Sequence, residues 1–199
     1  MRALAFSDVH RDEAAARDLA RRAADADVLV GAGDLATMRA GLQPVVDLLA
    51  ASTVPVILVP GNGESFEELA AACRPHGHLH PLHGNGVEIG GQSFFGLGGG
   101  IPVTPFGSWS WDLTEQEAEV LLAGCPEGGV LISHSPPHGT CDQDRDGIHL
   151  GSRAVREAIV RTRPQQVVCG HIHASWGQEG QIGPTPVLNA GPRGRLLDL

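Results

Sequence analysis

Five short apolar runs of this sequence each lead into residues whose side chains can bind a metal ion. Those residues are Asp8, His10, Asp34, Asn62, His134, His171 and His173. Ligands of open α/β sheets bind beyond the carboxyl ends of the strands, so five strand ends would bring these side chains to one rim. Carboxylate, amide and imidazole groups without sulfur favour Mn, Fe, Zn, Ni or Co.

The size of this set indicates two ions rather than one. Seven ligands exceed what one ion can use while it keeps a position open for a substrate, whereas two ions that share a carboxylate can use them all. Two ions about 3.5–4 Å apart suit an in-line displacement at phosphorus, with a bound water whose pKa falls to about 7. The chain has neither Lys nor Tyr, which excludes Schiff-base chemistry and a Tyr nucleophile.

Strands alternating with helices must position these residues. Strands are predicted over residues 2–7, 28–32, 54–59, 130–133, 167–169, 187–189 and 196–199, with a hairpin around Gly90-Gly91. Helices are predicted over residues 12–24, 42–51, 65–73, 114–123 and 152–161, the fourth opened by a capping box of Thr114 and Glu117. Continuously apolar strands in a β-α order favour a buried parallel sheet in a single α/β domain over residues 1–199.

Charge and cysteine content narrow the partners and the compartment. The 199 residues carry a formal net charge of −9, which opposes non-specific binding to nucleic acid or to an anionic membrane. A small anionic substrate stays possible where a bound cation reverses the local sign. The four cysteines are scattered and no apolar stretch reads as a leader or a span, so we expect a cytoplasmic protein, as a monomer or a homodimer.

Taken in order, the motifs resemble those of the calcineurin-like metallophosphoesterases. They are D-x-H at Asp8 and His10, G-D at Asp34, G-N at Asn62, a single His134 after a strand, and G-H-x-H at His171 and His173. The resemblance extends from Asp8 to about Gly191. It implies a four-layer α-β-β-α sandwich of two mixed β-sheets flanked by helices.

The resemblance also implies a role for each ligand. Asp8, His10 and His173 would hold the first metal, and Asn62, His134 and His171 the second. Asp34 would bridge the two ions opposite a bridging hydroxide that attacks phosphorus in line. We therefore expect a metal-dependent phosphohydrolase that binds two divalent metal ions, of which Mn is the favoured candidate. Its substrate would be a small phosphate ester or a nucleotide, and a diester more than a monoester.

One position departs from the family. The third motif usually reads G-N-H-[DE], but Gly63 stands here in place of the His that protonates the leaving oxygen. General-acid catalysis is worth about 10²–10⁴ in rate, and His138 or His149 could supply it instead. The alternative is a nucleotide-binding or regulatory module of the same fold that turns over little.

Three further features of the sequence each allow more than one interpretation. His76, His78, His80 and His83 could form a second metal site or an exposed turn and edge strand. The residues from Asp142 to Gly147 open like a calcium loop but lack its closing Glu, which favours a polar loop beside the substrate. Trp109 and Trp111 could stack on a base or aryl group, or could pin their Gly/Pro-rich strap, residues 98–111, to the body.

Overall fold

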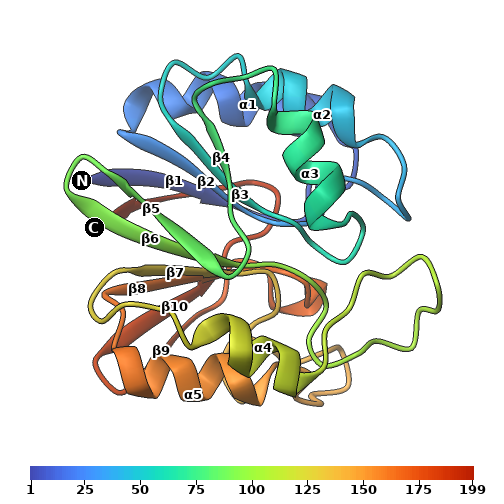
Figure 1. The fold of residues 1–199 in the computed structure, drawn as a ribbon, viewed down its shortest axis with the longest axis vertical. Coiled ribbons are helices and arrows are strands. Elements are labelled where there is room, and N and C mark those ends of the chain that lie inside the picture. Colours follow the sequence, from blue (N-terminus) through green and yellow to red (C-terminus); the bar gives the residue numbers. More distant parts are fainter.

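The computed structural model describes residues 1–199 throughout, as two β-sheets with helices on their outer faces (Figure 1). The first sheet contains, in spatial order, β11 (Arg195–Asp198), β1 (Arg2–Phe6), β2 (Val28–Ala32), β3 (Val56–Val59) and β4 (Leu79–Pro81). The second contains β5 (Asn85–Ile89), β6 (Gln92–Leu97), β7 (Val130–Ser133), β8 (Gln166–Cys169), β10 (Thr185–Asn189) and β9 (Glu179–Ile182). The helices are α1 (Glu13–Arg22), α2 (Leu42–Leu49), α3 (Phe66–Cys73), α4 (Glu115–Leu122) and α5 (Arg153–Thr162), with single 3-10 turns η1 (Ala23–Asp25) and η2 (His173–Ser175).

Both sheets are mixed: each has a parallel core, and three of the four edge strands are antiparallel. In the first, β1, β2, β3 and β4 run parallel and β11 pairs antiparallel with β1. In the second, β6, β7, β8 and β10 run parallel, with β5 and β9 antiparallel at the two edges. The carboxyl ends of the parallel strands within each sheet therefore meet at one rim, where the candidate ligands follow them.

Three apolar clusters fill the spaces between the four layers. One joins the first sheet to α1, α2 and α3, and another joins the second sheet to α4 and α5. The third lies between the sheets and includes Val30 of β2 and Val168 of β8. The neighbouring Leu29 points instead toward the helices that cover the first sheet, so β2 is buried on both faces. This explains why the strands read as continuously apolar, and it confirms the expected α-β-β-α sandwich.

Side-chain caps set the starts of α1, α3, α4 and α5 close to the predicted positions. The Asp12 carboxylate accepts a hydrogen bond from the Ala15 N–H, and Thr114 forms a capping box with Glu117. Ser65 forms a second capping box with Glu68 at α3, and the Ser152 hydroxyl accepts a hydrogen bond from the Val155 N–H at α5. The longest helices have 10 residues, and the fold contains no helix long and apolar enough to cross a membrane.

The edges of the sheets hold the elements that the sequence defines least. The expected hairpin is β5-β6, whose turn places Gly90 and Gly91 at φ 58° and 79°, as a type I′ turn requires. The edge strand β4 ends at Pro81, which lacks an N–H to donate to a ladder. The strand β9 was not predicted, because its polar sequence EGQI is held in place by pairing with β10.

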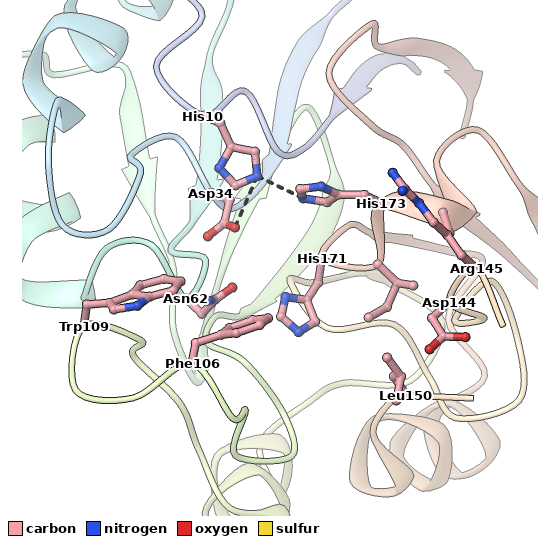
Figure 2. A pocket seen from close by; sticks show the side chains of 12 residues that line it. His10, Asp34, Asn62, Phe106, Trp109, Asp144, Arg145, Leu150, His171 and His173 are labelled. Carbon is pink, nitrogen blue, oxygen red and sulfur yellow. Dashed lines mark hydrogen bonds and ion pairs between the residues drawn. The ribbon is translucent and has the colours of Figure 1, made fainter. Parts of the chain in front are cut away.

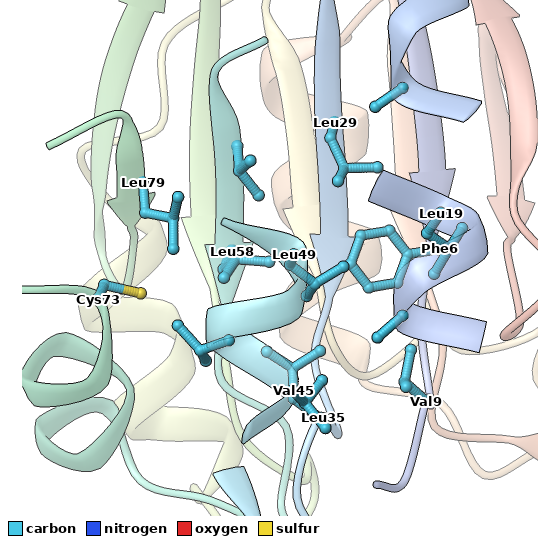
Figure 3. Packing of buried hydrophobic residues seen from close by; sticks show 14 of the residues in the cluster. Phe6, Val9, Leu19, Leu29, Leu35, Val45, Leu49, Leu58, Cys73 and Leu79 are labelled. Atoms are coloured by element: carbon cyan, nitrogen blue, oxygen red, sulfur yellow. The ribbon is translucent and has the colours of Figure 1, made fainter. Parts of the chain in front are cut away.

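The helix-side core gives a stability prediction (Figure 3). Leu49 on α2 is fully buried against the first sheet, so Leu49→Ala should lower the free energy of unfolding by about 2–5 kcal/mol. Val120→Ala on α4 is the matched control, since that side chain is 76% exposed and its loss should cost almost nothing. Urea denaturation of both variants measures the difference. Equal stabilities would contradict the packing described here.

Candidate metal centre

The seven candidate ligands follow five strands that belong to both sheets. Asp8 and His10 follow β1, Asp34 follows β2 and Asn62 follows β3, while His134 follows β7 and His171 and His173 follow β8. One contact joins the two rims directly, because the Nδ1 atom of His134 lies 2.8 Å from the carbonyl oxygen of Ala32 at the end of β2. The structure thus brings together residues that are up to 165 positions apart in the chain.

Asp8, His10 and His173 form the first group, whose ligand atoms all lie within 4.8 Å of one another. The Nε2 atoms of His10 and His173 are 3.0 Å apart, and the Nε2 atom of His173 is 3.8 Å from Oδ1 of Asp8. Two N–H groups cannot face each other at 3.0 Å, so at least one of these nitrogens presents a lone pair. That arrangement suits a cation between the rings.

The second group centres on Asp34 and His134. The Nε2 atom of His134 lies 3.6 Å from Oδ1 of Asp34 and 3.2 Å from Oδ1 of Asn62. The His134 and His171 rings meet edge to face, with centroids 4.9 Å apart. Asp34 also reaches the first group, since its Oδ2 atom is 3.6 Å from Nε2 of His10. Asp8 lies close enough to Asp34 and His134 to belong to this group too.

The electrostatics of the centre favour bound cations. Asp8 and Asp34 are 2% and 5% exposed, and neither forms an ion pair with an Arg. Burial opposes ionisation of Asp34, yet the neighbouring His134 and His10 lower the pKa of its carboxyl. Burial, with His134 beside it, lowers the pKa of His171 to about 3, which leaves that imidazole neutral and able to bind a metal. These oxygen and nitrogen ligands therefore suit divalent ions of hard or borderline character.

Four of the seven candidate ligands have strained backbone conformations. Asp8, His10, Asp34 and His171 all adopt left-handed backbone conformations, with φ between 48° and 66°. Such conformations are costly for non-glycine residues and cluster at functional sites. The backbone at position 61 can lie close to Asp34 only because the residue is Gly61, since a Cβ atom there would lie 2.0 Å from Oδ1 of Asp34.

Two residues with no assigned role in the sequence support the ligands. Glu64 is fully buried and accepts hydrogen bonds from the N–H groups of Leu35, Ala36 and Gly61, which ties the loop after β2 to the loop after β3. Burial and the nearby Asp34 raise the pKa of Glu64 to about 7. The sequence feature that could have indicated this role is the position of Glu64 shortly after the G-N motif.

Trp176 is the second such residue. Its indole N–H donates to Oδ2 of Asp8 at 3.0 Å, and its ring packs on His173 with centroids 4.3 Å apart. Nothing in the local sequence marks it, because the contact to Asp8 depends on how the loop after β8 folds back over β1.

The candidate acids His138 and His149 do not line the pocket at the metal centre. The rings of His138 and His149 have centroids 5.8 Å apart, and Nδ1 of His149 lies 2.6 Å from Asp142 Oδ1. The pocket, of about 370 Å³, has five of the candidate ligands at its base (Figure 2). The full lining is His10, Asp34, Asn62, Phe106, Trp109, Asp144, Arg145, Leu150, His171, Ile172, His173 and Ala174.

In the loop from Asp142 to Gly147, two carboxylates accept hydrogen bonds from nearby backbone N–H groups. Asp142 accepts from the N–H groups of Gly139 and Gly151, and Asp144 accepts from those of Asp146 and Ile148. This arrangement serves a loop beside the pocket rather than a calcium ion.

The histidines between α3 and β5 do not converge on one point. His76 pairs with Asp47 at 2.8 Å, whereas His83 packs between the rings of Phe66 and Trp111. His80 lies on the edge strand β4. The groups of side chains able to hold a metal all lie at the centre described above.

The chain matches a known protein family. Residues 1–175 match the calcineurin-like phosphoesterases. A UPF0046 protein of Caenorhabditis elegans is 34% identical over 109 residues, which are 55% of this chain and 36% of that protein. The chain thus matches little more than a third of the length of this relative.

Solved structures share the fold at low sequence identity. Protein TT1561 of Thermus thermophilus superposes with a TM-score of 0.79 at 20% identity, over 99% of this chain and 93% of that one. A dimetal phosphatase from Danio rerio gives 0.66 at 15% identity, over 96% and 88% of the two chains. The phosphopantetheinyl hydrolase of Mycobacterium tuberculosis gives 0.61 at 16%, over 96% and 90%.

These likenesses bear on the fold, whereas the family follows from the match over residues 1–175. That match covers all but the last 24 residues of the chain and includes every one of the seven gathered side chains. The chain therefore belongs to the calcineurin-like phosphoesterase family.

Proposed function

We propose that this protein is a dinuclear metal-dependent phosphohydrolase that cleaves small phosphodiesters in preference to monoesters. The observation that carries the proposal is the gathering of seven oxygen and nitrogen ligands around the buried carboxylate of Asp34, at the base of an open pocket. In this proposal Asp8, His10 and His173 hold one ion. Asn62, His134 and His171 would hold the other, Asp34 would serve both ions, and Mn²⁺ is the favoured metal.

The chain's own residues would prepare the ligand atoms. The contact of Nδ1 of His134 with the Ala32 carbonyl oxygen favours the tautomer that leaves Nε2 free to bind a metal. The low pKa of His171 keeps that ring neutral. When bound, two divalent cations would activate a water molecule and stabilise the charge that develops on the phosphoryl oxygens.

The strap orients Asn62. The Asn62 amide nitrogen donates to Oγ of Ser110 at 2.9 Å, which leaves its carbonyl oxygen directed toward His134. Ser110 in turn donates to Oδ1 of Asp112, whose Oδ2 accepts from Thr104. This chain of hydrogen bonds fixes which end of the Asn62 amide faces the centre, so we assign Ser110 a positioning role.

The diester preference rests on two features. Gly63 offers no acid for the leaving oxygen, and neither His138 nor His149 lines the pocket, so a substrate with a good leaving group is favoured. The pocket also has two walls, Phe106 and Trp109 on one side and Arg145 and Leu150 on the other (Figure 2). Two walls can hold the two substituents of a diester, whereas a monoester has only one.

The proposal also covers the binding partners of the protein and its cellular compartment. The net charge of −9 supports a small substrate held through cations rather than a nucleic-acid or membrane surface. All four cysteines are free and buried, in keeping with a reducing, cytoplasmic location. A monomer and a homodimer are both compatible with the fold.

Hydrolysis of bis-p-nitrophenyl phosphate tests the proposal, because its aryl leaving group needs little protonation. Metal-stripped protein should be inactive and should gain activity with Mn²⁺, and Asp34→Asn should abolish turnover by removing the shared charge. Asp198→Asn is the matched control, since that acid is exposed on β11 at the opposite end of β1. Unchanged activity in Asp34→Asn would contradict the two-metal centre. A wild type that binds Mn²⁺ without turnover would favour the binding module.

Removal of the Ser110 hydroxyl should weaken metal binding through Asn62. We expect Ser110→Ala to lower Mn²⁺ affinity by about 10–100-fold at one of two sites, as is usual for groups that orient ligands. Ser110→Thr keeps the hydroxyl and should retain most of the affinity, and Ser108→Ala, on an exposed neighbour, should retain all of it. Calorimetric Mn²⁺ titration measures each. An unchanged titration in Ser110→Ala would show that Asn62 needs no such partner.

A histidine at position 63 should restore an acid. A Cβ atom at Gly63 would lie 3.0 Å from the Ala36 carbonyl oxygen and 3.2 Å from Asp34 Oδ1, so the substitution is tight but the backbone allows it. Relative to Gly63→Ala, which adds the same Cβ, Gly63→His should raise turnover of a diester with an alkyl leaving group at least about tenfold. Turnover of the aryl diester should change little. An equal response of both substrates would refute the missing-acid explanation.

A further inference from the structure

Phe106 and Trp109 form an aromatic wall of the pocket. These two rings, here termed the aromatic platform, stack nearly parallel, with centroids 5.5 Å apart and planes 11° apart. Phe106 is 50% exposed, and both rings line the same pocket as His10, Asp34 and His171. Exposed aromatic surface at the edge of a polar site marks a place where a ligand supplies the missing contact.

Another residue already anchors the strap. The Trp111 ring packs on His83 with centroids 4.9 Å apart, and the backbone N–H of Trp111 donates to the Asn62 carbonyl oxygen at 2.9 Å. The side chains of Thr104 and Ser110 in the strap also form hydrogen bonds with each other and with Asp112, which follows the strap directly. The strap is therefore held without Trp109, whose ring remains available at the pocket.

The opposite wall carries the only Arg side chain that lines the pocket. Arg145 is exposed and forms no ion pair, although Asp144 and Asp146 flank it, because Asp144 accepts from loop N–H groups instead. A free guanidinium in a protein of net charge −9 is suited to bind an anionic oxygen of the ligand. Figure 2 shows Arg145 across the metal centre from Trp109.

We propose that the substrate carries a planar aromatic ring that stacks on the aromatic platform, as the base of a nucleotide would, and a second anionic group that Arg145 binds on the far side of the metal centre. This inference rests on the proposed phosphohydrolase function and specifies its substrate class. The scissile phosphate would lie between the two walls, over the ligands at the base. A nucleoside diphosphate has both features, and its α-phosphoryl group carries two substituents, as the phosphorus of a diester does.

Binding measurements separate this inference from the proposed function. We would titrate Mn²⁺-loaded protein calorimetrically with adenosine 5′-monophosphate and with ribose 5-phosphate, which lacks the base. The dissociation constant for the nucleotide should be about tenfold lower, since stacking on an aromatic side chain typically contributes that much or more. Trp109→Ala should erase the difference and Trp109→Phe should keep part of it.

The matched control lies on the same strap. Val103 is 60% exposed and does not line the pocket, so Val103→Ala should leave both dissociation constants unchanged. Equal affinity of wild type for the two ligands would overturn the aromatic platform, and so would a preference that survives Trp109→Ala. Failure of both ligands to bind in a Mn²⁺-dependent way would instead overturn the proposed function.

Arg145 has its own test. Adenosine 5′-diphosphate should bind several-fold more tightly than the monophosphate, and Arg145→Gln should remove that advantage while the preference for the base remains. Arg74→Gln, a change of an exposed Arg at the end of α3, is the control for net charge and should have no effect. An advantage of the diphosphate that persists in Arg145→Gln would overturn the role of Arg145.

Discussion

Two carboxylates, Asp8 and Asp34, are buried where the rims of the two sheets meet, and no Arg neutralises either of them. Burying an ionised carboxylate is costly unless it is paired or coordinates a metal. The imidazoles around them supply only part of the compensation, because burial keeps His171 neutral. A pair of cations would complete it, and the strained loop conformations, the glycine contacts and the Glu64 hydrogen bonds all serve to hold the carboxylates in place.

The α-β-β-α sandwich explains why such a centre forms from residues far apart in the chain. Each sheet is buried on both faces, so its parallel strands end at a defined rim and their loops have little freedom. The contact of His134 with the Ala32 carbonyl oxygen then fixes one rim against the other. Trp176 closes the arrangement from the side of β8, through its hydrogen bond to Asp8 and its packing on His173.

The strands, the capped helices and the gathering of the seven residues could be predicted from the sequence, because buried strands read as apolar runs and each leads into a polar residue. The support from Glu64 and Trp176 could not, since it depends on tertiary contacts between loops. The edge strand β9 was missed for a related reason, as pairing overrides its weak propensity. The strap carries two tryptophans with different surroundings, Trp111 packed on His83 and Trp109 facing the pocket, which only the fold distinguishes.

The proposed phosphohydrolase function depends on two ions sharing Asp34. The most direct measurement is a crystal structure of the protein soaked with Mn²⁺, with anomalous diffraction recorded to locate the metal. We predict two anomalous peaks about 3.5–4 Å apart, with Asp34 between them. One peak should contact Asp8, His10 and His173, and the other Asn62, His134 and His171. A single peak, or Mn²⁺ bound away from Asp34, would contradict a centre of two ions that share this carboxylate.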